Sequence, residues 1–264
     1  MGYWCYHDYK TVSMTLSATD ILNTLQTKRP VSIIRAGDGE KIVLESNKDI
    51  PAYRLCIESV MKRQVGYEPT MSEVESIRGN LAFAYYGADI VGIPMHERLQ
   101  DMNKHWRNVE QVVKPHCTTT KFTSTDVAYD MLYTEMFEQW LTNKRDVVYI
   151  SCRNIDAELK EHFSIKNVHS YIIAPEMKFT STYDDSKRHY PDQFNEIEWW
   201  LNNAPCDGTP CLVGAGVIGK IYCNWMRDRG GIAFDIGAVF DLWAGYATRG
   251  PERGLDKQYE KYKL

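Results

Sequence analysis

A loop rich in glycine and acidic residues follows the first apolar run of the chain. Residues 32–40 read Ser-Ile-Ile-Arg-Ala-Gly-Asp-Gly-Glu. Two glycines let the backbone take positive φ and approach a ligand closely, and two carboxylates only two residues apart can converge on one point. Such a pair suits Mg²⁺ or Mn²⁺, which takes further ligands from phosphates, and the arginine can bond to the same phosphates. The residues predicted to bind a diphosphate are Arg35, Gly37, Asp38, Gly39 and Glu40, with Asp38 and Glu40 as metal ligands. The alternative is a tight turn whose acids cap the following helix.

A second glycine-rich turn lies near the end of the chain. Residues 214–220 read Gly-Ala-Gly-Val-Ile-Gly-Lys between a predicted strand and a predicted helix, and Asp235 ends the next strand about twenty residues later. This is the pattern of a dinucleotide-binding turn. That pattern usually opens a sheet, whereas fewer than fifty residues follow it here. Locally, Gly214, Gly216 and Lys220 are predicted to hold an anion at the helix start; the alternative is a turn that packs helix against strand.

Two aspartates follow at the mouth of the last predicted strand. Asp235 and Asp241 lie in the segment Asp-Ile-Gly-Ala-Val-Phe-Asp. A carboxylate there can accept a proton from an attacking hydroxyl, and we assign this catalytic role to Asp241 and the holding of a hydroxyl to Asp235. The alternative for Asp241 is the cap of a final helix. Trp243 and Tyr246 either stack on a sugar ring or pack in the core, and the core is favoured for one of them.

Other polar residues after predicted strands carry less weight. Arg153 and Asn154 follow the third strand and are candidates for contacts with phosphate or ribose. His96 follows the second strand as a candidate base, although a surface histidine is favoured there. The polar segment 176–189 contains Tyr183, Asp184, Asp185 and His189. This segment suits an acceptor lid and a plain surface loop equally well.

The elements that position these residues follow an α/β pattern. Short apolar runs rich in valine and isoleucine alternate with segments of helical period. The predicted strands are Val31–Arg35, Ala88–Ile93, Asp146–Ser151, Val168–Ala174, Pro210–Gly214 and Gly231–Ile236. Strands that are apolar on both faces and separated by helices indicate a mainly parallel sheet covered on both sides. We therefore predict a single domain, 1–264, with a Rossmann-like sheet of about six strands and helices on both faces. Ligands of such sheets bind outside the carboxyl ends of the strands.

The composition excludes several classes of protein. Of the 264 residues, 44% are hydrophobic and 25% are charged, with a net charge of −4. These values are typical of a globular protein and lack the basic excess of a nucleic-acid-binding one. No apolar run reaches the roughly 18–20 residues that span a bilayer, and the first residues lack the pattern of a signal peptide. Seven cysteines without a Cys-x-x-Cys pair indicate free thiols. We expect a cytoplasmic protein with no transmembrane segment and no nucleic-acid partner.

The two glycine-rich segments together resemble the GT-D-fold glycosyltransferases, a bacterial group with a Rossmann-like sheet. That family carries an Asp-x-Glu motif in its first loop, matched by Asp38-Gly39-Glu40, and a terminal Asp-Ile-Gly segment, matched by Asp235-Ile236-Gly237. The resemblance covers about a fifth of the chain. It implies a divalent metal and a nucleotide sugar at the first loop. The chain departs from the characterised branch after Asp-Ile-Gly, where it has Ala238 and Phe240-Asp241-Leu242-Trp243, so neither acceptor nor base is implied.

These features predict a metal-dependent glycosyltransferase of the hexosyltransferase type. It would move a sugar from a nucleotide-diphosphate donor, with a UDP-sugar favoured, to a glycan or glycoconjugate acceptor, as in polysaccharide biosynthesis. Two alternatives stay open: an S-adenosylmethionine- or NAD-dependent enzyme that uses Gly214–Gly219, and a non-catalytic module that binds nucleotide or glycan. A homo-oligomer also stays open, because Trp199 and Trp200 suit either a face between copies of the chain or the core, which is favoured.

Overall fold

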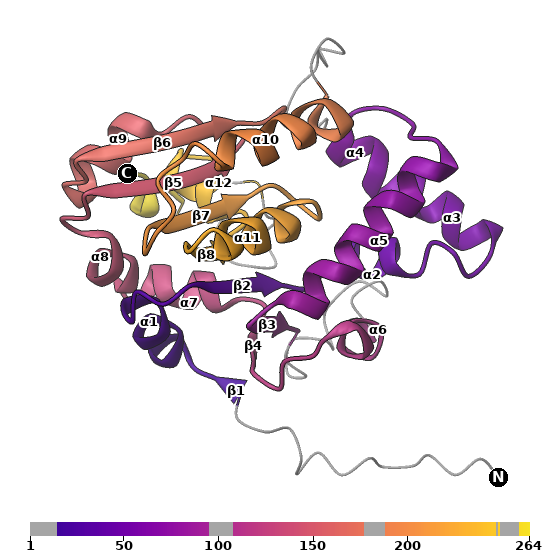
Figure 1. Cartoon of the computed structure of the whole chain (residues 1–264), viewed down its shortest axis with the longest axis horizontal. Helices are drawn as coiled ribbons and strands as arrows, with labels where there is room; N and C mark the ends of the chain where they lie inside the picture. Colours follow the sequence, from indigo (N-terminus) through magenta and orange to yellow (C-terminus); the bar gives the residue numbers. More distant parts are fainter. Residues whose placement is uncertain (1–14, 95–107, 177–187, 247, 249–258) are drawn as a thin grey trace.

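The structure, a computed structural model, describes residues 15–94, 108–176, 188–246, 248 and 259–264. Within these residues, eight parallel strands form one sheet that runs through the molecule (Figure 1). The strand order across the sheet is β1-β4-β3-β2-β8-β7-β5-β6. The strands are β1 Thr15–Leu16, β2 Val31–Arg35, β3 Ile90–Ile93, β4 Phe122–Ser124, β5 Asp146–Ser151, β6 Asn167–Ile172, β7 Pro210–Gly214 and β8 Ile232–Asp235.

The predicted α/β Rossmann-like fold is confirmed, and each of the six predicted strands is present. β2, β5 and β7 have the predicted bounds. Each of these strands is largely buried on both faces and ends at a turn. The strands that were not predicted are β1 and β4, of two and three residues. Both are shorter than the four or more residues that make an apolar run recognisable. They extend the sheet beyond β3, where Val91 of β3 pairs with Phe122 of β4.

Helices cover both faces of the sheet. The α-helices are α1 Ala18–Gln26, α2 Asp38–Leu44, α3 Ile50–Cys56, α4 Lys62–Val65, α5 Met71–Gly87, α6 Val109–Val113, α7 Val127–Tyr133, α8 Met136–Leu141, α9 Asp156–Phe163, α10 Phe194–Leu201, α11 Gly219–Asp228 and α12 Val239–Trp243. A π-helical stretch, η2 Ile57–Met61, joins α3 to α4, and a second, η7 His189–Gln193, precedes α10. The short 3₁₀ turns are η5 Lys114–His116 and η9 Tyr259–Tyr262.

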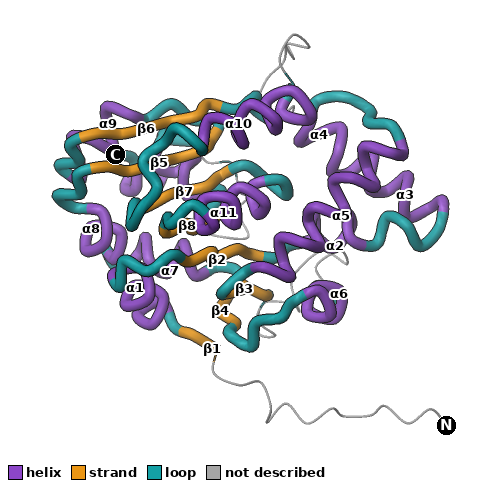
Figure 2. Tube along the Cα trace, viewed as in Figure 1, coloured by secondary structure: helices purple, strands orange, loops and turns teal. Residues whose placement is uncertain are grey.

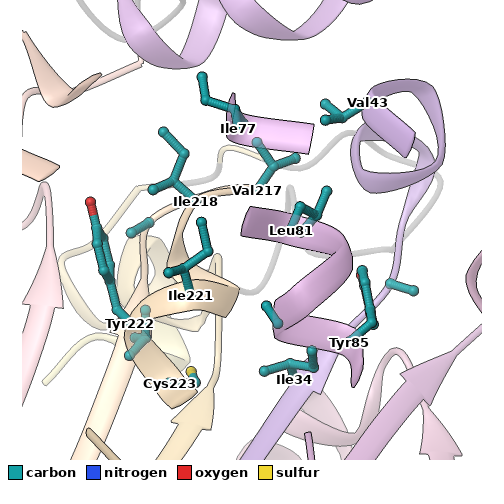
Figure 3. Close-up of a cluster of buried hydrophobic side chains, with 14 of the residues drawn as sticks. Ile34, Val43, Ile77, Leu81, Tyr85, Val217, Ile218, Ile221, Tyr222 and Cys223 are labelled. Carbon is teal, nitrogen blue, oxygen red and sulfur yellow. The ribbon is translucent and has the colours of Figure 1, made fainter. Parts of the chain in front are cut away.

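The apolar core lies in two layers, one on each face of the sheet. On the first face, α5 and α11 pack side by side over β2; Figure 3 shows Leu81 and Tyr85 of α5 close to Ile34 of β2 and to Ile221 of α11. The second layer is aromatic and includes Phe137, Trp140, Phe234 and Trp243. Burial of Trp243 confirms the prediction that one of the two terminal aromatic residues packs in the core.

The tandem tryptophans on α10 do not both join the core. Trp200 is half-buried and packs edge-on against Tyr171 of β6, with ring centroids 5.6 Å apart. Trp199 is 69% exposed, so the prediction of a core position is wrong for this residue. The helix has one apolar side, and consecutive residues on a helix point in directions about 100° apart, which explains why the pair divides.

The middle of the sheet is a switch point in its topology. β2 and β8 are neighbours, with Ile33 paired to Phe234. After β2 the chain adds β3 and β4 toward one edge of the sheet. It then forms β5 and β6 at the opposite edge and returns through β7 to β8 in the middle. α2 packs on one face and α12 on the other, so the loops after β2 and β8 diverge and leave a crevice. Figure 2 shows α3 and α4 to the right of the sheet, on the side toward which the strand arrows of Figure 1 point.

Candidate active site

A cavity of about 410 Å³ lies at the carboxyl ends of the central strands. It is lined by each residue predicted for the site: Arg35, Gly37, Asp38, Gly39, Glu40, Gly214, Gly216, Lys220, Asp235 and Asp241. Polar residues that were not predicted also line it: Ser59, Arg63, Gln64, Thr125, Asp126 and Tyr129. The last three follow β4, whose short polar sequence gave no strand signal. The first three lie on η2 and α4 and reach the cavity through tertiary packing, which leaves no local pattern.

The first loop turns directly into α2. Glu40 Oε2 accepts a hydrogen bond from the backbone N–H of Gly37 at 2.8 Å, and Asp38 Oδ1 accepts one from the N–H of Gly39 at 3.0 Å. Neither glycine has positive φ, so the conformational reason predicted for them is wrong. Gly39 instead permits close packing, because a Cβ there would lie 3.2 Å from Val217 Cγ1. The two glycine-rich loops therefore touch.

A buried network of four charges joins these loops. Lys220 Nζ lies 2.7 Å from Glu40 Oε1 and 3.0 Å from Asp235 Oδ2, and it donates to the carbonyl oxygen of Gly216 at 2.9 Å. The ammonium group, which has three hydrogens, therefore lies against three oxygens of the protein, one through a hydrogen bond and two through ion pairs. Arg35 Nη2 lies 3.5 Å from Asp235 Oδ1, and Arg35 Nη1 donates to Thr125 O at 3.0 Å. Two cations and two carboxylates thus balance each other, as burial requires.

Burial and pairing act in opposite directions on the pKa values of this network. Burial disfavours the charged form of Asp235, but Lys220 and Arg35 outweigh that effect and hold the pKa of Asp235 below its ordinary value. Burial likewise acts to lower the pKa of Lys220, but Asp235 and Glu40 raise it above its ordinary value. Both groups are therefore charged at neutral pH. Lys220 makes its ion pairs and its hydrogen bond within the protein, which differs from the predicted role of holding an anion of a ligand.

The fit of a divalent ion to the first loop depends on Asp38 and Glu40. The two oxygens of Glu40 are engaged by the Gly37 amide and the Lys220 ammonium, so Glu40 does not fit a metal ligand in this arrangement. Across the described ranges, no three His, Cys, Asp or Glu side chains cluster closely enough to hold an ion. Asp38 is half-buried on the cavity wall. Because Mg²⁺ often takes one or two carboxylates and fills its other positions with water and phosphate, Asp38 fits an ion that arrives with a phosphate-bearing ligand.

The second glycine-rich turn is already contacted by a side chain. The backbone N–H of Val217, near the start of α11, donates to Gln64 Oε1 at 2.8 Å. Gly216 has φ +58°, and a Cβ there would lie 2.3 Å from the same oxygen. Gln64 therefore occupies the position from which a pyrophosphate would approach a dinucleotide-binding turn. Gly214 serves packing, since a Cβ there would lie 2.5 Å from the ring of Phe240.

Asp241 lines the cavity and belongs to a second hydrogen-bond network. Its Oδ1 accepts from Arg153 Nε at 2.8 Å, and its Oδ2 accepts from the hydroxyl of Thr248. The Arg153 guanidinium also covers the ring of Tyr246, 4.1 Å from the ring centroid. Arg153 thus contacts Asp241, and a proton accepted by Asp241 would weaken that ion pair.

His189 is buried and also lines the cavity. Its Nε2 lies 2.9 Å from the hydroxyl of Tyr222, and the backbone of Gln64 bonds to the same ring. Burial lowers the pKa of His189 to about 4, although the bond to Gln64 opposes the shift. The imidazole is therefore neutral at pH 7. The other candidates His96, Tyr183, Asp184 and Asp185 lie outside the described residues.

We expect His189 to make the fold sensitive to mild acid. Its pKa falls from about 6.5 in the unfolded chain to about 4 in the fold, so the unfolded state binds the extra proton first. Stability is fully present above pH 6.5 and is lost as the pH falls toward 4. The free energy of unfolding should drop by about 2 kcal/mol between pH 7 and pH 5. Urea titrations at the two pH values would measure this drop, which should shrink in His189→Gln and persist in His162→Gln, a change at an exposed histidine. An equal drop in His189→Gln would assign the acid sensitivity to other groups.

The fold and its cavity define a parallel α/β protein with a polar site at the sheet's switch point. The model of the GT-D fold-like domain matches residues 14–243. The chain therefore belongs to this family. A solved structure described as a "highly conserved domain of unknown function 1792" with "a distinct glycosyltransferase fold" is similar, with a TM-score of 0.54 at 15% identity, over 94% of this chain and 93% of that one. No curated protein matches the sequence. Within the described residues, no helix has the length and apolar character needed to cross a membrane.

Proposed function

We propose that the chain is a glycosyltransferase that moves a hexosyl group from a nucleotide-diphosphate sugar, a UDP-sugar in the first instance, to a hydroxyl of a glycan or glycoconjugate. Its GT-D fold-like family and the glycosyltransferase fold of the similar structure support the reaction class. One observation carries the proposal: the Gly37–Glu40 loop meets Asp235 and Asp241 in one cavity at the switch point of the sheet. This is where α/β sheets bind nucleotides.

Each residue of the proposed site has a separate task. Asp38 would hold Mg²⁺ or Mn²⁺, and such an ion would neutralise charge on the departing nucleotide diphosphate. Glu40, Lys220 and Asp235 keep the first loop and the second turn in register through their ion pairs. Asp241 lines the cavity and takes the role of proton acceptor for the attacking hydroxyl. Asp126, which lines the cavity from the end of β4, is the second candidate for that role.

The competing functions differ in which loop binds the ligand. A dinucleotide or S-adenosylmethionine enzyme would need the turn 214–219 open to the ligand, and Gln64 opposes this because it bonds to Val217 and faces Gly216. A non-catalytic module would bind nucleotide without consuming a donor. These differences make the functions separable by binding and turnover.

A donor panel tests the proposal. The purified chain would be incubated with Mn²⁺ and UDP-, GDP- or ADP-sugars, with and without glycan acceptors, and the released nucleoside diphosphate would be measured. Calorimetry with UDP, NAD and S-adenosylmethionine would run in parallel. We expect release from a UDP-sugar and binding of UDP alone among the three ligands. Binding of NAD or S-adenosylmethionine without UDP binding would overturn the proposal, and UDP binding without turnover on any acceptor would reduce the chain to a binding module.

A further inference from the structure

The basic side chains that line the cavity differ in the contacts that they make within the protein. Three basic side chains line it: Arg35, Arg63 and Lys220. The Lys220 ammonium forms ion pairs with Glu40 and Asp235 and donates to the Gly216 carbonyl. Arg35 is largely buried, pairs with Asp235 and donates to Thr125. Both therefore hold parts of the protein together, and Arg35 keeps one buried N–H, that of Nε, without a hydrogen-bond partner among the described residues.

Arg63 differs from the other two. It is exposed at the cavity wall, and within the described part of the chain it forms neither an ion pair nor a hydrogen bond. Its guanidinium keeps five N–H donors for a ligand, arranged to bond to two oxygens of a phosphate at once. A charge-assisted bond of this kind is strongest where negative charge develops during a reaction, as on a departing diphosphate.

The backbone that carries Arg63 is anchored against the first loop. The next residue, Gln64, bonds to the N–H of Val217 at 2.8 Å. A Cβ at Gly39 would lie 3.7 Å from Gln64 Nε2 and 4.0 Å from Val60 Cγ1, so α4 and the Gly37–Glu40 loop lie in contact. The preceding stretch is π-helical, a local geometry that is frequent at functional sites. Ser59, four residues before Arg63, lines the same cavity.

We propose that Arg63 binds the diphosphate of the donor, while Lys220 and Arg35 act as positioning residues that hold the two loops. This inference deepens the proposed function and rests on it. It assigns the anion-binding charge to η2 and α4, the helical segment between the first loop and α5. Lys220, the lysine of the glycine-rich turn, then does not bind the diphosphate.

Binding measurements on Arg63→Ala test the inference. Titrations with UDP and with inorganic pyrophosphate would be compared for the wild type, Arg63→Ala and Arg63→Lys. We expect Arg63→Ala to weaken both ligands by about tenfold or more, since a hydrogen bond to a charged group is lost. Arg63→Lys should recover part of the affinity, because it keeps the charge and loses the paired donors. The melting temperature should not change, since Arg63 has no partner in the described residues.

Lys62→Ala is the matched control. Lys62 precedes Arg63 on the same helix, pairs with Glu68 at 2.8 Å and does not line the cavity. Its loss should leave both affinities unchanged. Wild-type affinity in Arg63→Ala, or equal losses in Arg63→Ala and Lys62→Ala, would overturn the inference while the proposed function stands. Failure of the wild type to bind any nucleoside diphosphate would overturn the proposed function and this inference with it.

Discussion

Asp38→Asn is expected to lower sugar transfer by about 100-fold or more while the melting temperature stays near that of the wild type. A bound divalent ion stabilises the charge on the leaving group by several kcal/mol, and the amide side chain is a much weaker ligand than a carboxylate. The fold should tolerate the change, because the asparagine oxygen can still accept the bond that Gly39 N–H donates to Asp38. Rates of UDP release across a Mn²⁺ titration, together with thermal melts, would measure both effects.

Glu40→Gln provides the contrast that separates the two acids of the motif. Glu40 pairs with the buried Lys220, so its neutralisation should lower stability first and activity only through the loss of loop geometry. Glu45→Gln is the matched control, since Glu45 follows the same helix and pairs with the exposed Lys48. Near wild-type transfer by Asp38→Asn at saturating Mn²⁺ would remove the metal from the proposed mechanism. Equal rate losses in Asp38→Asn and Glu40→Gln with unchanged melting temperatures would restore both acids as metal ligands.

The fold was predictable where one local pattern was strong enough. Val31–Arg35 and Pro210–Gly214 are buried on both faces and end at glycine-rich turns, and their bounds were predicted without error. β4 owes its pairing to β3 rather than to its own Phe-Thr-Ser sequence. The helical stretch after β4 is divided into α7 and α8, because Glu135 between them adopts a left-handed backbone, φ 57°. Neither the short strand β4 nor the break at Glu135 is marked by a pattern in the amino-acid sequence.

The location of the site was more predictable than the roles within it. Carboxyl ends of neighbouring parallel strands meet at one edge, so residues 35–40 and 214–241 had to converge once the sheet was assumed. Their partners depend on tertiary packing. The sequence around Lys220 does not show that Lys220 forms ion pairs with Glu40 and Asp235. Likewise, the sequence around Gly216 does not indicate that Gln64 is its neighbour. Metal use, the donor, a homo-oligomeric state and a cytoplasmic location stay predictions.

Lys220→Met is expected to destabilise the fold by about 3–5 kcal/mol, since removal of one partner leaves buried charges uncompensated. For a chain of this size that corresponds to a melting temperature lower by about 10 °C. Glu40 and Asp235 would both be left without the ammonium that lies within 3.0 Å of each. The double variant Lys220→Met/Glu40→Gln should recover part of the loss, because one of the two stranded carboxylates is then neutral.

The pH dependence of this loss follows from the two pKa shifts. The pKa of Asp235 is depressed in the fold, so its stabilisation is present above the unfolded pKa of about 3.9 and is lost as the pH falls below it. The pKa of Lys220 is raised, so its stabilisation is present below about pH 10.4 and is lost as the pH rises through the folded value. Between these limits both groups of the wild type stay charged. In Lys220→Met a stranded buried carboxylate takes up a proton more readily, because burial disfavours its charged form. The difference between wild type and Lys220→Met should therefore be larger at pH 9 than at pH 6, which chemical denaturation at pH 6, 7.5 and 9 would check. Lys62→Met, at the exposed lysine paired with Glu68, should melt as the wild type does. If Lys220→Met instead keeps the wild-type melting temperature and loses affinity for UDP, the role of Lys220 is to bind the ligand and not to hold the two glycine-rich loops together.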